Sequence, residues 1–321
     1  MDLTWRPLTL DDAERMAEVY SAAEEVDKTG EYYSADDFRE ELEFTNTDLP
    51  GGSTGGWDGD RLVAYALVRR RDAANPVHMV RHEFKVRPEY RDDAMGAHLM
   101  AWILDTAKKV HAGAFPDAPL ELHDGAHHTE TWAAAMLAKA GYEHRRTMVE
   151  MRADLGVLPP AAAFPDGLAP VRYEDRYDEL TREARNDTFA GHYGSTVMSP
   201  EVWRTSVTGV RAFQPELSFL VLSPSGDEVQ AHVLSYFFEA DAVATGVREL
   251  FVQWVGTRSS LRGKGVATAL LGHTLVAAKA AGYERSMLLV DVDNTHRALG
   301  VYERCGYQVS GENHIYVLPV G

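Results

Sequence analysis

The alternation of apolar and polar positions predicts strands and helices in turn along the whole chain. Short apolar runs at residues 62–68, 218–222 and 230–236 lie next to turns centred on Gly59 and Gly226, which is typical of β-hairpins. Longer segments with helical spacing of apolar residues follow in both halves. We therefore predict a fold that mixes strands and helices, of the α/β (α+β) class.

The same order of elements occurs twice. In each half a strand leads through an arginine-containing turn into a long amphipathic helix, with Arg91 in the first turn and Arg262 in the second. Further along each half, a helical segment ends in a Gly-Tyr pair, which begins at Gly141 in the first half and at Gly306 in the second. This internal repeat predicts two domains of one kind.

A segment of different composition separates the two copies. Residues 154–167 contain three prolines and two glycines, which favour neither a helix nor a strand. We therefore predict a first domain at residues 1–153, a linker at 154–167 and a second domain at 168–321.

The charge balance restricts the partners. With 49 acidic and 32 basic residues the formal net charge is −17, which argues against nucleic acid, because a phosphate backbone requires a basic surface. A cationic substrate fits this charge, and so does plain solubility. The sequence contains no apolar run of the roughly 20 residues that a membrane span needs, and its start lacks the features of a signal peptide.

The single cysteine, Cys305, excludes an internal disulfide and is expected to pack as a small buried residue. We expect a cytoplasmic protein, either a monomer or a homodimer. The histidines His123, His127 and His128 have the spacing of no standard zinc site, and no metal is predicted.

The segment with the clearest chemistry is the turn after the strand near residue 255. Glycines at 263 and 265 allow a tight backbone, and the helix that follows exposes unpaired amides at its positive N-terminus. Such a helix start holds a pyrophosphate. A Walker loop would need Ser or Thr after Lys264, where Gly265 stands. A dinucleotide fingerprint, with Ala267 replacing its third glycine, and an ordinary glycine-rich turn remain open.

Arg262, Gly265 and Ala267 resemble the acetyl-CoA signature of the GNAT (GCN5-related N-acetyltransferase) superfamily. A second set of residues follows at the order and spacing common in that family: Asn294, Ala298, Tyr302 and Gly306-Tyr307. A tandem pair with a weaker first copy is similar to the mycothiol synthase type, which acetylates an amine on a cysteinyl amino sugar. The resemblance implies two tandem domains, each a splayed mixed sheet flanked by helices.

The resemblance also implies the binding of acetyl-CoA as co-substrate, without a metal. The pyrophosphate would lie on the turn, and the pantetheine along the preceding strand and near Asn294. The residues expected to bind acetyl-CoA are Val255, Thr257, Arg262, Gly263, Lys264, Gly265, Val266, Ala267 and Asn294. Asn294 is alternatively a helix N-cap, and the two roles can coexist.

Tyr302 would protonate the leaving thiolate; the alternative is an aromatic side chain that packs on the sheet. The base is less determined. Glu249, on the strand before the turn, could relay a proton through water, or be a surface charge at a strand edge. His192, in a loop that precedes a helix starting after Ser199, could be a base or an acceptor contact, or a structural histidine.

The first copy departs from this pattern. Asp92 and Asp93 stand where the second copy has Gly263 and Lys264, and Leu137 replaces Tyr302. Carboxylates repel a pyrophosphate, and leucine donates no proton. The prediction is an acetyl-CoA-dependent N-acetyltransferase that acts on a small-molecule amine, with catalysis in the second domain. A non-catalytic CoA-binding or scaffold protein, and an O- or protein-acetyltransferase, are the alternatives.

Overall fold

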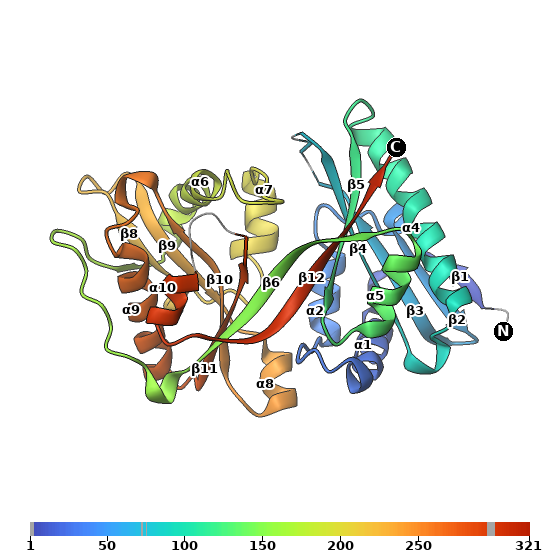
Figure 1. The fold of residues 1–321 in the computed structure, drawn as a ribbon, viewed down its shortest axis with the longest axis horizontal. Coiled ribbons are helices and arrows are strands. Elements are labelled where there is room, and N and C mark those ends of the chain that lie inside the picture. The colour runs from blue at the N-terminus through green and yellow to red at the C-terminus, as the bar shows by residue number, and fades with distance from the viewer. Residues whose placement is uncertain (1–2, 72, 75, 294–298) are drawn as a thin grey trace. The chain divides into compact units, whose positions relative to one another are not determined.

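The computed structural model describes residues 3–71, 73, 74, 76–293 and 299–321. The chain divides into two compact units (Figure 1). Unit 1 comprises Met1–Thr147 and Glu312–Gly321, and unit 2 comprises Met148–Gly311. Both mix strands and helices, as the periodicity predicts. Among the described helices, none has the length and apolar character that crossing a bilayer requires.

The sheet of unit 1 has the strand order β1-β2-β3-β4-β5-β12. Its strands are β1 (Thr4–Arg6), β2 (Ser53–Asp58), β3 (Arg61–Arg69), β4 (His78–Val86), β5 (Leu120–His127) and β12 (Gln308–Val320). β4 and β5 run parallel, and the other neighbours are antiparallel. β2 and β3 form the hairpin predicted around Gly59.

Helices cover both faces of this sheet. They are α1 (Ala13–Asp27), α2 (Ala35–Leu42), α3 (Leu49–Gly52), α4 (Asp93–Ala114) and α5 (Thr131–Lys139). Successive side chains of β3 point to opposite faces of the sheet, and helices bury them on both faces. Ala64 and Ala66 pack with α4 and α5, whereas Tyr65 and Leu67 pack with α1 and α2.

The sheet of unit 2 has the order β6-β11-β10-β9-β8-β7. Its strands are β6 (Glu143–Asp154), β7 (Val171–Arg172), β8 (Phe219–Leu222), β9 (Val229–Tyr236), β10 (Glu249–Thr257) and β11 (Arg285–Asp291). β10 and β11 are parallel, and β8 and β9 form the predicted hairpin around Gly226.

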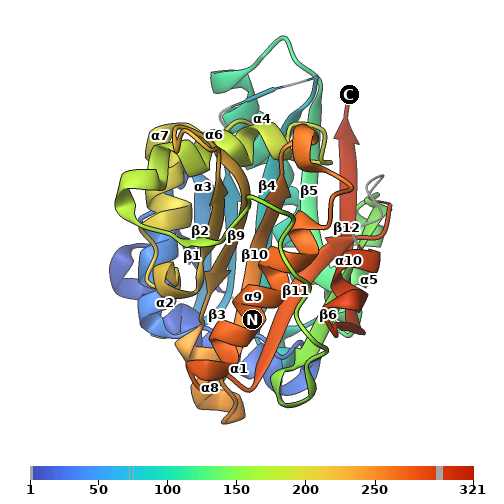
Figure 2. The same cartoon turned by 90° about the vertical axis from the view of Figure 1, so that its left-hand side faces the viewer.

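The helices of unit 2 again divide between two faces. They are α6 (Asp178–Thr188), α7 (Pro200–Trp203), α8 (Glu239–Thr245), α9 (Val266–Ala280) and α10 (Leu299–Arg304). Figure 2 looks onto the face that α9 covers, where Leu270 and Leu271 pack against the sheet. On the other face, Ala184 of α6 and Trp203 of α7 form a separate core. Ser199 caps α7 through the Val202 amide, as its sequence predicts.

The last strands of the two sequence copies are exchanged between the compact units. The division expected at residues 153 and 168 follows the repeats, but Met148–Asp154 of β6 pair with β11 in unit 2. Conversely, Asn313–Val320 of β12 pair with β5 in unit 1. Figure 1 shows both strands passing from one unit into the other. The partner of each last strand is set by tertiary packing, which the order of motifs along the chain does not reveal.

The predicted linker has little regular structure, apart from a short 3₁₀ turn at Leu155–Val157. It is nevertheless packed against unit 2. The Lys279 ammonium donates a hydrogen bond to the Gly156 carbonyl at 3.1 Å, and the rings of Phe164 and His273 lie 6.3 Å apart. The segment is therefore part of the second core.

Equivalent hydrogen bonds confirm the internal repeat. In the first copy the Tyr142 amide donates to the Leu137 carbonyl at 3.0 Å. In the second copy the Tyr307 amide donates to the Tyr302 carbonyl at 3.1 Å. The two Gly-Tyr pairs therefore end their helices in the same way, and the alignment of Tyr302 with Leu137 is structurally sound.

Candidate active site

The turn between β10 and α9 has a backbone that its glycines permit. Gly263 and Gly265 have φ values of 75° and 80°, in the left-handed region that strains other residues. A Cβ at either position would meet no other atom within 4 Å, so the backbone conformation is what requires glycine. Residues 262–265 are exposed, and in this part of the chain no side chain caps α9. The first amides of α9 therefore remain available to an anion.

The corresponding turn of unit 1 begins in the same way. Arg91 Nε donates to the Val86 carbonyl at 3.1 Å. In unit 2, Arg262 Nε donates to the Thr257 carbonyl, also at 3.1 Å. Arg91 additionally forms a two-pronged ion pair with Asp27, at 2.7 and 2.6 Å. The arginine of unit 1 is thus held by a carboxylate of α1.

The two turns then diverge. In unit 1 the Asp92 side chain is the N-cap of α4, and its Oδ1 accepts the Met95 amide at 2.7 Å. This amide corresponds to that of Val266 in unit 2. A carboxylate therefore occupies the helix start of unit 1 where unit 2 leaves the amides open. Lys139 and Asp93 form an exposed ion pair beside this turn.

The parallel pairing of β10 and β11 stops early. It joins Glu249–Phe251 to Arg285–Met287, whereas β10 continues beside β9 as far as Thr257. A β-bulge interrupts that second ladder between Val252 and Trp254. Past Phe251 the edge of β10 that would face β11 has no strand partner among the described residues, and Val255 and Thr257 lie on this stretch. The splay that the family resemblance implies is present in unit 2.

Thr257 adds an unsatisfied group beside the turn. Its Oγ1 is buried and has no hydrogen-bond partner among the described residues. A buried hydroxyl without a partner costs free energy, which a bound polar ligand would offset. With the open amides of α9, this atom fits the requirements of a phosphate or pantetheine group.

Tyr302 lies on α10, half-buried at the edge of the second core. Burial, followed by the nearby Cys305, raises the pKa of its hydroxyl to about 12. This hydroxyl makes no hydrogen bond to a described residue. It therefore carries its proton at neutral pH and has no acceptor within the described chain. Both properties suit a general acid.

Glu249 stands at the start of β10 between two arginines. Arg152 Nε donates to its Oε2 at 3.3 Å, and Arg285 Nε lies 3.2 Å from its Oε1. Burial, with smaller effects that include the Glu249 charge, raises the pKa of Tyr307, whose ring centroid is 6.2 Å from that of Tyr302. Because an arginine lies at each oxygen, a proton from the acceptor would reach this carboxylate through water.

His192 belongs to a different group, on the α6 side of the sheet. Its ring lies 4.4 Å from that of Phe189, and Phe189 in turn packs edge-on against Trp254 at 5.0 Å. The Arg185 guanidinium lies 4.5 Å from the Trp254 ring, within range of a cation–π interaction. The sequence predicts His192 as a site residue. It does not identify Arg185 and Trp254, because neither belongs to a recognisable motif.

His232 was also missed, although it interrupts an otherwise apolar strand. It is fully buried, and neither ring nitrogen has a hydrogen-bond partner among the described residues. Burial, with the charges of Arg185 and Arg258, lowers the pKa of His232 to about 3. A Cβ at Gly256 would approach its ring to 2.2 Å, so Gly256 allows this histidine to fit.

Asn294 lies outside the described residues. Cys305 is buried, as expected, and burial raises the pKa of its thiol to about 11. His127 forms a hydrogen bond with the Thr129 hydroxyl at 2.5 Å. No group of metal-ligating side chains is found within the described ranges.

The comparisons with known sequences agree on one family. The family model described as "Acetyltransferase (GNAT) family" matches residues 178–307. A mycothiol acetyltransferase of Tsukamurella paurometabola is 32% identical over 238 residues, which cover 73% of this chain and 76% of that protein. A mycothiol acetyltransferase of Thermobispora bispora is 28% identical over 258 residues, 78% of each chain.

Solved structures extend the likeness to the whole chain. A GCN5-related N-acetyltransferase from Sphaerobacter thermophilus matches with a TM-score of 0.76 at 22% identity, over 99% of this chain and 95% of that one. A tandem GNAT protein from the clavulanic acid biosynthesis pathway matches with a TM-score of 0.69 at 15% identity, over 100% and 99%. At these identities the match concerns the fold, and it confirms the predicted tandem α/β architecture.

Proposed function

The chain belongs to the GNAT family of acetyltransferases, and on this premise we propose that unit 2 transfers the acetyl group of acetyl-CoA to the amine of a small molecule. One observation carries the proposal. The turn at residues 262–265 leaves the α9 amides open beside the unpaired edge of β10, whereas Asp92 occupies the equivalent position in unit 1.

The binding of acetyl-CoA in unit 2 rests on three features. The amides from Gly263 to Ala267 would hold the pyrophosphate, with Arg262 and Lys264 adding positive charge at the rim. Thr257 Oγ1, which is buried without a partner among the described residues, would accept or donate a hydrogen bond to the same ligand. The free edge of β10 at Val255 would bind the pantetheine amides. Asn294 stays a prediction from the family resemblance.

The reaction moves the acetyl group from sulfur to nitrogen. The acceptor nitrogen forms the new bond to the carbonyl carbon and loses a proton, while the carbon–sulfur bond breaks and the sulfur gains one. Tyr302 would supply the proton to sulfur, because its hydroxyl is protonated at neutral pH and makes no competing hydrogen bond to a described residue.

Two residues remain candidates for the base. Glu249 lies at the start of β10, and its charge adds to the effect of burial in raising the pKa of Tyr307, the ring beside Tyr302. It would act through a water molecule, because Arg152 and Arg285 bind its two oxygens. His192 lies with Phe189 on the α6 face, a position that suits contact with the acceptor. We therefore propose Glu249 as the base and His192 as an acceptor contact.

The acceptor is proposed from the names of the relatives and from charge. Proteins 32% and 28% identical are named mycothiol acetyltransferases, which favours an amine on a cysteinyl amino sugar or a related compound. The net charge of −17 favours an acceptor that is cationic in solution.

A test is the release of free CoA thiol with a panel of acceptors, with the acetylated product identified by mass spectrometry. Cysteinyl glucosamine and other small amines should support turnover. The matching alcohols and a lysine-containing peptide serve as controls. Turnover confined to alcohols would indicate an O-acetyltransferase, and turnover confined to the peptide a protein acetyltransferase. Binding of acetyl-CoA without turnover on any acceptor would favour a scaffold role.

A further inference from the structure

Unit 1 contains a cavity of about 150 Å³ that the proposed chemistry does not use. It lies among α1, α2, β3, β4 and the end of β5. A cavity of this volume is large enough to hold a molecule the size of benzene. Its lining combines aromatic rings with carboxylates, which is unlike the apolar interior of a core.

Aromatic side chains form one wall. The rings of Tyr20 and Tyr33 have centroids 4.7 Å apart, and Tyr33 and Phe38 are 5.3 Å apart. Tyr65 packs edge-on against Phe38 at 5.9 Å. Clustered ring faces carry partial negative charge and attract organic cations as well as aliphatic chains.

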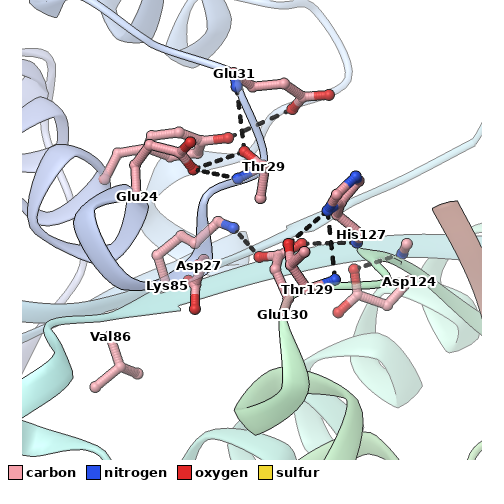
Figure 3. Close-up of polar contacts among 12 residues, drawn as sticks. Glu24, Asp27, Thr29, Glu31, Lys85, Val86, Asp124, His127, Thr129 and Glu130 are labelled. Carbon is pink, nitrogen blue, oxygen red and sulfur yellow. Dashed lines mark hydrogen bonds and ion pairs between the residues drawn. The ribbon is translucent and has the colours of Figure 1, made fainter. Parts of the chain in front are cut away.

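A fixed loop closes the side next to α1. The buried Glu24 carboxylate accepts hydrogen bonds from the Thr29 amide at 3.0 Å and the Thr29 hydroxyl at 2.7 Å (Figure 3). It also accepts the Gly30 amide at 2.7 Å. These hydrogen bonds use the Glu24 carboxylate to hold the loop, so this carboxylate is not available to bind a ligand. The wall is formed before any ligand binds.

The charges at the two ends of the cavity differ. At one end Lys85 of β4 is paired with Glu130, as Figure 3 shows, and these two charges balance. At the other end a single guanidinium, that of Arg69, serves two carboxylates, Glu41 at 2.8 Å and Glu83 at 3.0 Å. Burial and the Glu83 charge raise the pKa of Glu41. The Arg69 guanidinium is therefore divided between two carboxylates, and Arg81 is its cross-strand neighbour on β4.

An independent feature points to a ligand at the acidic end. Tyr65 is 1% exposed and lines the cavity. Its hydroxyl makes no hydrogen bond with any residue in the described ranges. Burial and the charges of Glu83 and Glu41 raise the pKa of this hydroxyl, so it stays protonated next to the carboxylates. Because Tyr65 lines the cavity, its hydroxyl can bond to a ligand or to water there.

We propose that this cavity binds a small organic cation, a primary ammonium or guanidinium compound, whose charged group lies at Glu83 and the Tyr65 hydroxyl and whose carbon chain lies against the aromatic wall. The ammonium or guanidinium N–H groups would donate to both oxygen atoms. The site belongs to unit 1 and does not depend on the activity proposed for unit 2.

Isothermal titration calorimetry on the full chain tests the proposal with n-butylammonium and n-butylguanidinium, against n-butanol and butyrate. Only the two cations should bind. Tyr65→Phe keeps the ring and removes the hydroxyl that has no partner in the described chain, so the protein should fold. Tyr65→Phe and Glu83→Gln should each raise the Kd at least about tenfold, the weight of a hydrogen bond to a charged group. Tyr90→Phe and Glu89→Gln, which lie outside the cavity lining, provide matched controls, for which the Kd should not change.

Several outcomes would overturn the proposal. Equal affinity for n-butylammonium and n-butanol would mean that the cavity selects size and not charge. Binding of the cations that survives both Tyr65→Phe and Glu83→Gln would put their site elsewhere, for instance in unit 2. If no probe gives a heat of binding, the cavity holds only solvent and the proposal is wrong. None of these results would bear on turnover in unit 2, so the two proposals fail separately.

Discussion

The contrast between the two helix starts predicts the effect of a single carboxylate at Gly265. Gly265→Asp would place a carboxylate at the N-cap position of α9, the position that Asp92 holds at the start of α4. Because φ is 80° at this position and a Cβ meets no atom within 4 Å, the cost to stability is limited to the left-handed backbone, about 1–2 kcal/mol at most. The protein should therefore fold.

The effect on acetyl-CoA binding should be much larger. Two unit charges 4 Å apart repel by about 1 kcal/mol at the dielectric of water and by about 4 kcal/mol at an effective dielectric of 20. Two phosphate charges near the new carboxylate thus cost at least about 2 kcal/mol, or about 30-fold in Kd. Part of this loss should disappear at high salt, since exposed charges are screened.

Calorimetry with acetyl-CoA, together with turnover, provides the assay. Gly226→Asp is the matched control, because Gly226 has a φ of 78° and equally open surroundings in the hairpin of unit 2. Ala94→Asp makes the same change at the equivalent position of unit 1 and should leave turnover intact. Unchanged affinity and turnover in a folded Gly265→Asp protein would refute the assignment of this turn. Loss of turnover in Ala94→Asp alone would move catalysis to unit 1.

The remaining predictions concern the acid, a buried histidine, a helix cap and salt. Tyr302→Phe should lower kcat by about 100- to 10,000-fold with the Kd for acetyl-CoA retained. The control is Tyr307→Phe, which removes a hydroxyl bonded to Ser286 at 2.7 Å and should not lower kcat in this way. A kcat of Tyr302→Phe within a few-fold of the original would exclude Tyr302 as the acid. Burial lowers the pKa of His232 from 6.5 to about 3, so the unfolded state binds the proton first as the pH falls. The free energy of unfolding should therefore fall between about pH 6.5 and 3, by about 1.4 kcal/mol per pH unit for this group. Urea titrations of His232→Leu should show a shallower pH dependence, and an identical slope would contradict the lowered pKa. Asp92→Ala removes the cap of α4 and should cost about 1 kcal/mol of unfolding free energy, measured by urea denaturation; no change would mean that the cap is dispensable. If the acceptor is cationic and drawn by the net charge of −17, its KM should rise with ionic strength, and a KM that stays flat would argue against electrostatic recruitment.

Features that depend on local backbone chemistry could be predicted from the sequence. The glycines at 263 and 265 indicate left-handed backbone, and both adopt it. The Gly-Tyr pairs at 141 and 306 end their helices with equivalent hydrogen bonds. The run of apolar residues in β3, beside the turn at Gly59, indicates a hairpin strand, and β3 is one. Each of these follows from neighbours a few residues apart, whose mutual geometry is nearly independent of the rest of the chain.

Features that depend on contacts between distant segments were decided only by the tertiary structure. The exchange of β6 and β12 between the units, the two arginines around Glu249, and the burial of His232 involve partners far away in sequence. The cavity beside Tyr65 belongs to the same class, because α1, α2 and β3–β5 enclose it only after folding. Local chemistry determines where the backbone turns, but burial and charge pairing are properties of packed surfaces, and no short stretch of sequence contains both sides of a packed surface.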